Sequence, residues 1–305
     1  MSIRHVAVVG LGVIGAGWVA QFLGAGLQVR CFDPSAEATA ALEPFLARAL
    51  GDASAWQSRL CVAQDLQDAM HGVDLVQENG PEALPLKRAL IEAIDAAAAP
   101  STLIASSTSG HRPSDLQAMA RAHPQRILVA HPLNPPHLIP LLEVVPGQRT
   151  SATDLSRAVA FYESLGKKVI VPRHERVGHA ANRLQAALLR EAFALAIDGT
   201  LDVPDIDAIL THGLALRWAA AGPFALTELG GGAAGSRAML ERLGPALNGW
   251  WGDLSRLELD ESARETLLEA MARHPSTPCS AHEMHRLVQH TLRYQAFWTG
   301  TAPDP

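Results

Sequence analysis

A histidine and a glutamate in the middle of the chain have the types and spacing needed for acid–base chemistry. His131 follows the aliphatic run 127–130 and precedes a proline-rich turn, so it lies at the carboxyl end of a predicted strand. Glu143 is the one charge in the apolar run 139–145, where an unpaired buried carboxylate would be costly. We expect Glu143 to bind the imidazole of His131 and to make it an oriented general base. The alternatives are a solvent-facing carboxylate and a structural histidine before a turn.

Further polar groups follow two other predicted strands. The strand predicted at 103–105 leads into a serine-rich turn at 106–109, and an acidic loop follows the strand predicted at 74–77. Ligands of a parallel sheet bind beyond the carboxyl ends of its strands. Glu82, Ser107, Ser109 and His131 all lie just past such ends, so we expect a ligand site there.

The amino-terminal segment carries a dinucleotide-binding fingerprint. A strand at 6–9 is followed at once by the glycine-rich segment GLGVIG at 10–15 and then by a helical pattern. Gly10 permits a tight turn, Gly12 lets the backbone approach a pyrophosphate, and Gly15 allows close packing of helix on strand. The pyrophosphate would bind at the helix amino terminus, where free N–H groups favour an anion.

An acidic residue stands where the ribose of the cofactor would bind. The next predicted strand, 28–32, ends at Asp33, about the expected 20 residues after the fingerprint. A carboxylate there binds both ribose hydroxyls and repels a 2'-phosphate, so we expect NAD rather than NADP. The alternative is a glycine-rich turn in another α/β protein, with Asp33 acting as a helix cap.

The predicted elements define two domains. Short strands alternate with helices up to a last strand at 167–171, which predicts an α/β Rossmann-type, doubly wound parallel sheet over residues 1–177. In this part we expect residues 35–71 to be helical with a break near Gly51, and further helices at 86–99 and 159–166. Beyond Val177 the strand pattern stops, so residues 178–305 are expected to be all-helical, with a long apolar helix at 182–197 and another ending at Gly213. The glycines at 230–235 follow no strand and predict a turn between helices.

The composition excludes several classes of protein. A net charge of -6 without a basic patch argues against nucleic-acid and anionic-membrane partners. No secretory signal or membrane span is predicted, and three distant cysteines predict reduced thiols and a cytoplasmic location. His282, His285 and His290 could form a zinc site or a solvated helix face, and the second is favoured because the fuller zinc signatures are absent. We therefore expect no metal.

The motifs together resemble the 3-hydroxyacyl-CoA dehydrogenase family over most of the chain. The resemblance rests on the segments Val8–Gly17, Ala105–Ser109, His131–Pro135, Leu142–Val144 and Asn182–Leu184. It implies a nucleotide-binding domain, then a helical domain that forms a homodimer, with the active site in the cleft between the domains. It also implies NAD as cofactor and a small-molecule substrate.

The resemblance assigns roles position by position. His131 is similar to the catalytic base, Glu143 to its orienting carboxylate, Ser109 to the serine that binds the reacting oxygen, and Asn182 to the asparagine beside them. His131 would take a proton from the hydroxyl at C3 while a hydride leaves for the nicotinamide. The expected cofactor site comprises Gly10, Gly12, Val13, Ile14, Gly15, Asp33, Glu82, Lys87 and Ser107. Asn182 could equally cap the helix that it begins.

The sequence departs from acyl-CoA members of the family where those carry a lysine-rich helical excursion. Between Pro34 and Lys87 the basic residues are only Arg48 and Arg59. The Arg217–Trp218 pair resembles the branch that oxidises free hydroxy acids such as L-gulonate and L-carnitine, and the sequence does not choose between these. Arg217 would hold the substrate carboxylate, with Trp218 as a pocket wall.

Other readings stay open. Arg217 could be a surface residue at a helix end and Trp218 ordinary core. The chain could be a dehydrogenase of fatty-acid oxidation that acts on CoA esters, or a non-enzymatic, crystallin-like or redox-sensing dinucleotide-binding protein. A decarboxylating hydroxyacid dehydrogenase with a lysine base is disfavoured, because neither Lys167 nor Lys168 begins a helix of the second domain.

Overall fold

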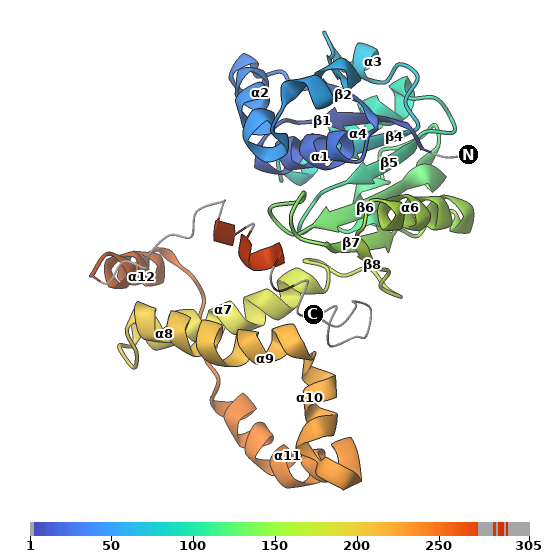
Figure 1. Ribbon diagram of the computed structural model, residues 1–305. Coiled ribbons are helices and arrows are strands. Elements are labelled where there is room, and N and C mark those ends of the chain that lie inside the picture. Colours follow the sequence, from blue (N-terminus) through green and yellow to red (C-terminus); the bar gives the residue numbers. More distant parts are fainter. Residues whose placement is uncertain (1–2, 274–282, 285, 290, 292–305) are drawn as a thin grey trace, which may run out of the picture. The chain divides into compact units, whose positions relative to one another are not determined.

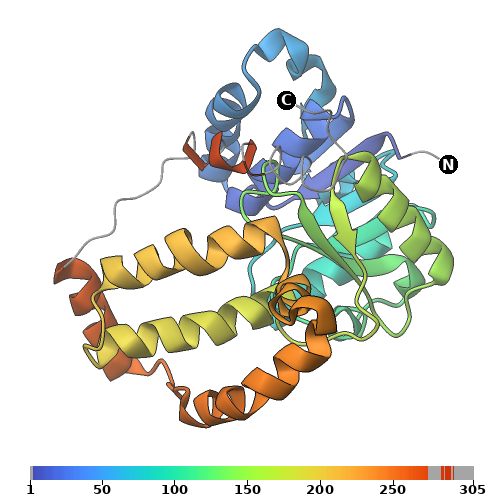
Figure 2. The same ribbon diagram turned by 60° about the horizontal axis from the view of Figure 1, so that its bottom comes forward.

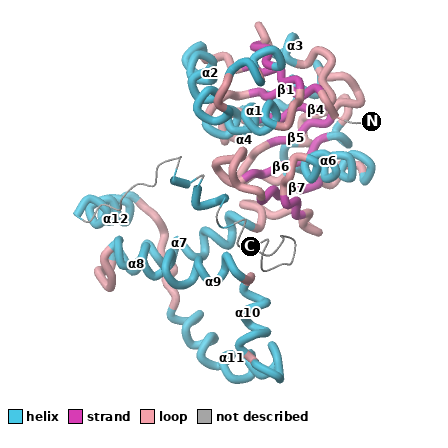
Figure 3. The backbone as a smooth tube through the Cα atoms, viewed as in Figure 1, coloured by secondary structure: helices cyan, strands magenta, loops and turns pink. Residues whose placement is uncertain are grey.

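The computed structural model describes residues 3–273, 283–284, 286–289 and 291 (Figure 1). The chain divides into two compact units, residues 1–183 and 184–305. All strands of the described chain lie in the first unit, and the regular structure among the described residues of the second unit is helical (Figure 3). The expected order of an α/β sheet domain followed by a helical part is therefore confirmed. The domain boundary near Val177 stays a prediction.

An eight-stranded sheet forms the centre of the first unit. Its strands are β1 (His5–Val9), β2 (Gln28–Phe32), β3 (Leu60–Val62), β4 (Leu75–Glu78), β5 (Leu103–Ser106), β6 (Ile127–Pro132), β7 (Leu141–Pro146) and β8 (Lys168–Ile170), in the spatial order β3-β2-β1-β4-β5-β6-β7-β8. The sheet is parallel from β3 to β6, whereas β7 runs antiparallel to β6. The short connection 133–140 suits an antiparallel pair, because a parallel pair needs a longer crossover. The doubly wound sheet is confirmed, and the reversal at β7 was not foreseen.

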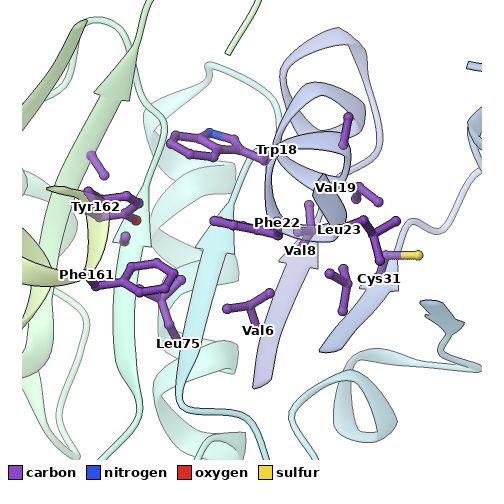
Figure 4. Packing of buried hydrophobic residues seen from close by; sticks show 14 of the residues in the cluster. Val6, Val8, Trp18, Val19, Phe22, Leu23, Cys31, Leu75, Phe161 and Tyr162 are labelled. Atoms are coloured by element: carbon purple, nitrogen blue, oxygen red, sulfur yellow. The ribbon is translucent and has the colours of Figure 1, made fainter. Parts of the chain in front are cut away.

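Helices cover both faces of this sheet and create two hydrophobic cores. Side chains of α1 (Val13–Gly24) and α6 (Ala152–Ser164) pack with Val6 and Val8 of β1 (Figure 4), and side chains of α2 (Ala36–Leu50) belong to the same core. Those of α3 (Leu66–Ala69), α4 (Leu84–Ala97) and α5 (Pro113–Leu116) pack with Ala7 and Val9. Successive residues of a strand point to opposite faces, so one buried strand supplies both cores.

The structure corrects two expectations for the first unit. Residues 35–71 are not all helical around one break: α2 ends before Gly51, 3-10 turns follow at Ala53–Ala55 and Gln57–Arg59, and β3 precedes the short α3. β3 was missed because it is a short, largely exposed edge strand with little hydrophobic signal. The helix expected from Val159 begins instead at Ala152, since the hydroxyl of Ser151 accepts a hydrogen bond from the amide of Asp154 and caps it.

The second unit contains mainly helices. They are α7 (Ala181–Ile197, which starts in the first unit), α8 (Val203–Ile209), a π-helical segment (Leu210–Leu214), α9 (Ala215–Ala220), α10 (Pro223–Gly230), α11 (Gly235–Asp253) and α12 (Glu261–Arg273). α10 and α11 pack against each other across the expected glycine turn (Figure 2). The helix expected to end at Gly213 continues through the π segment into α9, because a single glycine weakens a helix without stopping it.

The structure places two of the three cysteines, whereas the third cysteine and the candidate zinc ligands lie outside the described residues. Cys31 is a buried free thiol and Cys61 an exposed one, whereas Cys279 is outside the described part. The candidate zinc ligands His282, His285 and His290 are also outside it. Among the helices of the described chain, none has the length and apolar character needed to cross a membrane.

A buried ion pair fixes the start of β6, the strand that carries His131. Arg126 is 1% exposed, and its Nη2 lies 2.9 Å from Oδ1 of Asp95 on α4. Its guanidinium also donates to backbone carbonyls at the end of α4. Asp95 in turn accepts from the amide of His123, so the pair ties α4 to the segment before β6.

Replacing Arg126 by Met should lower the free energy of unfolding by about 3–5 kcal/mol, because the carboxylate of Asp95 would stay buried without its cation. Urea unfolding measures the change, with Arg121→Met, at an exposed arginine nearby, as the control. A loss within the roughly 0.5 kcal/mol typical of surface substitutions would contradict this account.

Candidate active site

A pocket opens where the carboxyl ends of β4, β5 and β6 lie side by side. Its volume is about 260 Å³, and its lining residues are Ile14, Asn79, Gly80, Glu82, Lys87, Ser107, Ser109, His131 and Pro132. They come from the start of α1, from the loops after β4 and β5, from α4 and from β6. The structure therefore brings together Ile14 of the glycine segment, the acidic loop, the serine-rich turn and the candidate base. Asn79, Gly80 and Pro132 were not singled out from the sequence.

The glycine segment leaves room for a pyrophosphate at the start of α1. Gly10 has a φ of +88°, and a Cβ there would lie 2.6 Å from the carbonyl oxygen of Asn79. A Cβ on Gly15 would lie 1.8 Å from the carbonyl oxygen of Gly10. Gly12 is the N-cap of α1, no side chain caps this end, and the first turn holds no acidic residue. The helix amino terminus is thus left able to bind an anion, as the fingerprint requires.

Asp33 is tied to this glycine segment. Its Oδ2 accepts a hydrogen bond of 2.7 Å from the amide of Leu11, and its Oδ1 accepts one of 2.8 Å from the amide of Ser35. The N-cap of α2 is Ser35, whose hydroxyl accepts from the amide of Ala38, so Asp33 is not the cap of that helix. A half-buried carboxylate fixed beside the glycine turn is suited to accept hydrogen bonds from ribose hydroxyls.

His131 and Glu143 lie opposite each other on the antiparallel pair β6 and β7. His131 Nδ1 is 2.9 Å from Glu143 Oε2, and both side chains are buried. Because a carboxylate accepts, the proton lies on Nδ1, and Nε2 keeps its lone pair. Burial by itself would raise the pKa of Glu143, but hydrogen bonds from His131 and from the amides of Ala180 and Ala181 outweigh it and hold that pKa below its ordinary value.

Glu82 holds the serine-rich turn together. Its Oε1 accepts from the hydroxyl of Thr108 (2.5 Å), from the amide and hydroxyl of Ser109 (2.8 and 3.2 Å) and from the amide of Gly110 (3.0 Å). Burial would raise the pKa of Glu82, yet these donors and Lys87 lower it overall. The amide group of Asn182 donates to the carbonyl of Ser109 at 2.9 Å, so Asn182 and Ser109 are neighbours. Their roles toward a reacting oxygen stay predictions.

Lys87 and Ser107 line the pocket, but their polar atoms are engaged within the protein. Lys87 Nζ lies 3.1 Å from Glu78 Oε1, 3.3 Å from Glu82 Oε2 and 2.9 Å from the carbonyl of Gly80. A direct contact of Lys87 with the cofactor stays a prediction.

The hydroxyl of Ser107 is surrounded in a similar way. It accepts from Trp18 Nε1 (3.0 Å) and Gln77 Nε2 (2.8 Å) and donates to Asn79 Oδ1 (2.7 Å). Ser107 therefore fixes Asn79, a pocket residue that directly follows β4. A direct contact of Ser107 with the cofactor also stays a prediction.

Arg217 and Trp218 lie on α9 of the second unit, and both are exposed. Trp218 is 42% exposed. Their predicted contact with the substrate stays a prediction.

A glycine turn leading into an uncapped helix, an acid after the second strand and a buried histidine–glutamate pair define a nucleotide-dependent oxidoreductase. Residues 5–175 match the NAD-binding domain of 3-hydroxyacyl-CoA dehydrogenase, and residues 178–249 match its C-terminal domain. The chain belongs to the 3-hydroxyacyl-CoA dehydrogenase family and is an NAD-dependent oxidoreductase.

Known relatives cover most of the chain. It is 44% identical to L-carnitine dehydrogenase of Streptomyces coelicolor, over 88% of this chain and 86% of that protein. It is 41% identical to 3-hydroxyacyl-CoA dehydrogenase of Gibberella moniliformis, over 94% and 91%. Among solved structures it resembles the NAD-dependent dismutase 5-formyl-3-hydroxy-2-methylpyridine 4-carboxylic acid 5-dehydrogenase, with a TM-score of 0.79 and 28% identity over 98% of this chain and 100% of that one.

Asp33 should set the preference for NAD over NADP. We expect at least about a tenfold preference in kcat/KM, equivalent to roughly 1.4 kcal/mol, because a 2'-phosphate would meet the carboxylate. Asp33→Ala should narrow this ratio, whereas Glu163→Ala, which removes an exposed charge on α6, should leave it unchanged. Steady-state kinetics with both cofactors measure it, and equal use of NADP by the unaltered protein would refute the assignment.

Proposed function

We propose that this protein oxidises the C3 hydroxyl of a small free hydroxy acid, with His131 as general base and L-carnitine as the first substrate to test. The observation that carries the proposal is the buried pair of His131 and Glu143, 2.9 Å apart, whose His131 lines a pocket that also includes Ile14 of the glycine segment. The pocket therefore has an oriented proton acceptor near the expected binding site of a hydride acceptor, and oxidation of a secondary alcohol needs both.

The proton step follows from the geometry of the pair. Glu143 holds the proton of His131 on Nδ1, so Nε2 can take the proton of the substrate hydroxyl. The imidazolium formed is stabilised by the same carboxylate, which is already ionised because its pKa is lowered. Bound NAD supplies the hydride acceptor. Ser109 and Asn182 are proposed to polarise the oxygen at C3 as it becomes a carbonyl.

The substrate class rests on the relatives and on charge. L-carnitine dehydrogenases share 40–44% identity with this chain over most of its length. In the stretch between Pro34 and Lys87, Arg48 is exposed, whereas Arg59 is half buried and donates to the carbonyl of Leu23. The phosphates of CoA usually require several contacts from Arg or Lys. A free carboxylate needs one arginine, and Arg217 is the candidate.

A CoA ester is the second candidate substrate. The observation in its favour is the relative from Gibberella moniliformis, whose name is 3-hydroxyacyl-CoA dehydrogenase and which aligns with 94% of this chain. L-gulonate, the other free acid named above, belongs in the same substrate panel.

We also propose that the protein forms a homodimer through its helical unit. α7 has an apolar composition but a single buried residue, Ala196. Large apolar side chains on later helices are exposed, including Phe224 (88%), Leu229 (77%) and Trp251 (63%). Apolar surface on this scale usually marks an interface.

We further propose that the protein is cytoplasmic. The reduced state expected of its cysteines supports this location.

Replacing the proposed base should abolish most turnover. His131→Asn should leave NADH binding nearly intact and lower kcat by roughly 10² to 10⁴, the usual worth of a positioned general base. Glu143→Gln should have a similar but smaller effect through orientation. His174→Asn, at an exposed histidine of the same unit, is the control. A wild-type kcat in the His131→Asn variant would contradict the proposed role of His131 as general base.

The substrate class can be decided by a panel of L-carnitine, L-gulonate, 3-hydroxybutyrate and acetoacetyl-CoA. We expect a free acid to be used, and Arg217→Ala to raise its KM far more than it lowers kcat, as loss of uniform binding does. Arg237→Ala, at an arginine whose side chain is 85% exposed on α11, should change neither value. Efficient turnover of the CoA ester with inert free acids would instead favour a dehydrogenase of fatty-acid oxidation.

A further inference from the structure

His179 stands in a strained turn directly before the amides that bind Glu143. Its φ is +49°, and it follows Gly178 at +75°. A residue other than glycine rarely adopts a positive φ, and such backbone strain persists only where the surrounding structure fixes the conformation. The next two residues, Ala180 and Ala181, donate their amides to Glu143. The turn at His179 therefore presents these amides to the carboxylate that orients the proposed base.

The side chain of His179 is buried in the same place. It is 2% exposed, and its Nε2 lies 3.1 Å from the carbonyl oxygen of Thr108. A carbonyl only accepts, so the proton of the neutral ring lies on Nε2. Nδ1 is buried and has no hydrogen-bond partner among the described residues. A buried acceptor without a partner is costly, so simple packing would be served as well by an apolar ring.

The ring of His179 also packs against the ring of His131. The centroids are 5.1 Å apart, with the planes inclined by 42°. Burial lowers the pKa of His179, and a charge on His131 lowers it further, against the opposing effects of Thr108, Glu143 and Glu82. His179 therefore stays neutral beside the base, and the proton removed from the substrate is left to His131.

We propose that His179 is a positioning residue for the reaction: it forms one wall for the His131 ring and ties that ring to the serine-rich turn through the carbonyl of Thr108. Thr108 directly precedes Ser109, and its hydroxyl donates to Glu82. One side chain thus sets the distance between the proton acceptor and the group proposed to bind the reacting oxygen. This inference rests on the proposed role of His131 as base.

The donor and the ring of His179 can be tested separately. His179→Gln keeps an N–H donor of similar reach, His179→Met has the same length without a donor, and His179→Phe keeps a ring without a donor. All of them meet the same backbone strain. We expect His179→Met to lower kcat by about 10- to 100-fold, as small displacements of catalytic groups do, with the KM for NAD unchanged. His179→Gln should recover several-fold of this loss, and His179→Phe should fall between the wild type and Met.

Equal kcat values for the Gln and Met variants, or wild-type turnover in the Phe variant, would overturn the proposal. If Met fails to fold, the Phe variant decides, because the proposal requires its kcat to lie below that of the wild type. Urea unfolding of each variant and its affinity for NADH separate loss of positioning from loss of structure.

A measurement without substrate keeps this inference distinct from the proposed function. Histidine-selective ¹⁵N NMR detects the Nδ1–H proton of His131 in its hydrogen bond to Glu143, assigned through its loss in His131→Asn. We expect this signal to persist in His179→Gln and to broaden or move in His179→Met. An unchanged signal in the Met variant would overturn the positioning role. Undiminished turnover in His131→Asn would instead refute the proposed base, and the NMR comparison would still show whether His179 positions that ring.

Discussion

The hydrogen bond between His131 and Glu143 is the interaction on which the rest of the site depends. A carboxylate buried at 3% exposure is stable only if it is satisfied, and Glu143 is satisfied by one imidazole and by the amides of the turn at 180–181. The antiparallel pairing of β6 with β7 puts the two residues in register. The short connection between these strands, and the tie of β6 to α4 through Arg126, therefore have consequences for the chemistry at the far end of the strand.

A second group of buried charges lies beside the pocket that His131 lines. Glu78 and Lys87 are almost wholly buried and paired, and Lys87 also reaches Glu82. A buried pair of this kind adds little net stability, but removing one partner is strongly destabilising. Glu82, which Lys87 contacts, accepts hydrogen bonds from the amides of Ser109 and Gly110 in the serine-rich turn. The fixed negative charge of Glu82 thus lies next to the place proposed for the reacting groups.

Three carboxylates of this unit fix loops in the same way. A carboxylate gathers backbone amides from a loop and holds that loop in one conformation: Glu82 does so for residues 109–110, Glu143 for residues 180–181, and Asp33 for the glycine segment through Leu11. Charge-assisted bonds to amides are stronger than neutral ones. Loops that carry functional groups are otherwise the most mobile parts of an α/β fold, so anchoring them in this way pre-organises the pocket.

The sequence by itself determined the class of fold, the position of the glycine turn before α1 and that of Asp33 after β2, because these follow from local pattern. It also determined that Glu143 binds His131, because an unpaired buried charge is costly. It missed β3, whose short exposed strand has no periodic signal, and the reversal at β7. Only the tertiary structure decided that the hydroxyl of Ser107 is enclosed by Trp18, Gln77 and Asn79, and that Lys87 is paired with two glutamates. It alone revealed His179, an isolated histidine after a glycine in the sequence. These contacts join residues far apart along the chain, and packing, which local pattern does not encode, selects among the partners that each polar group could take.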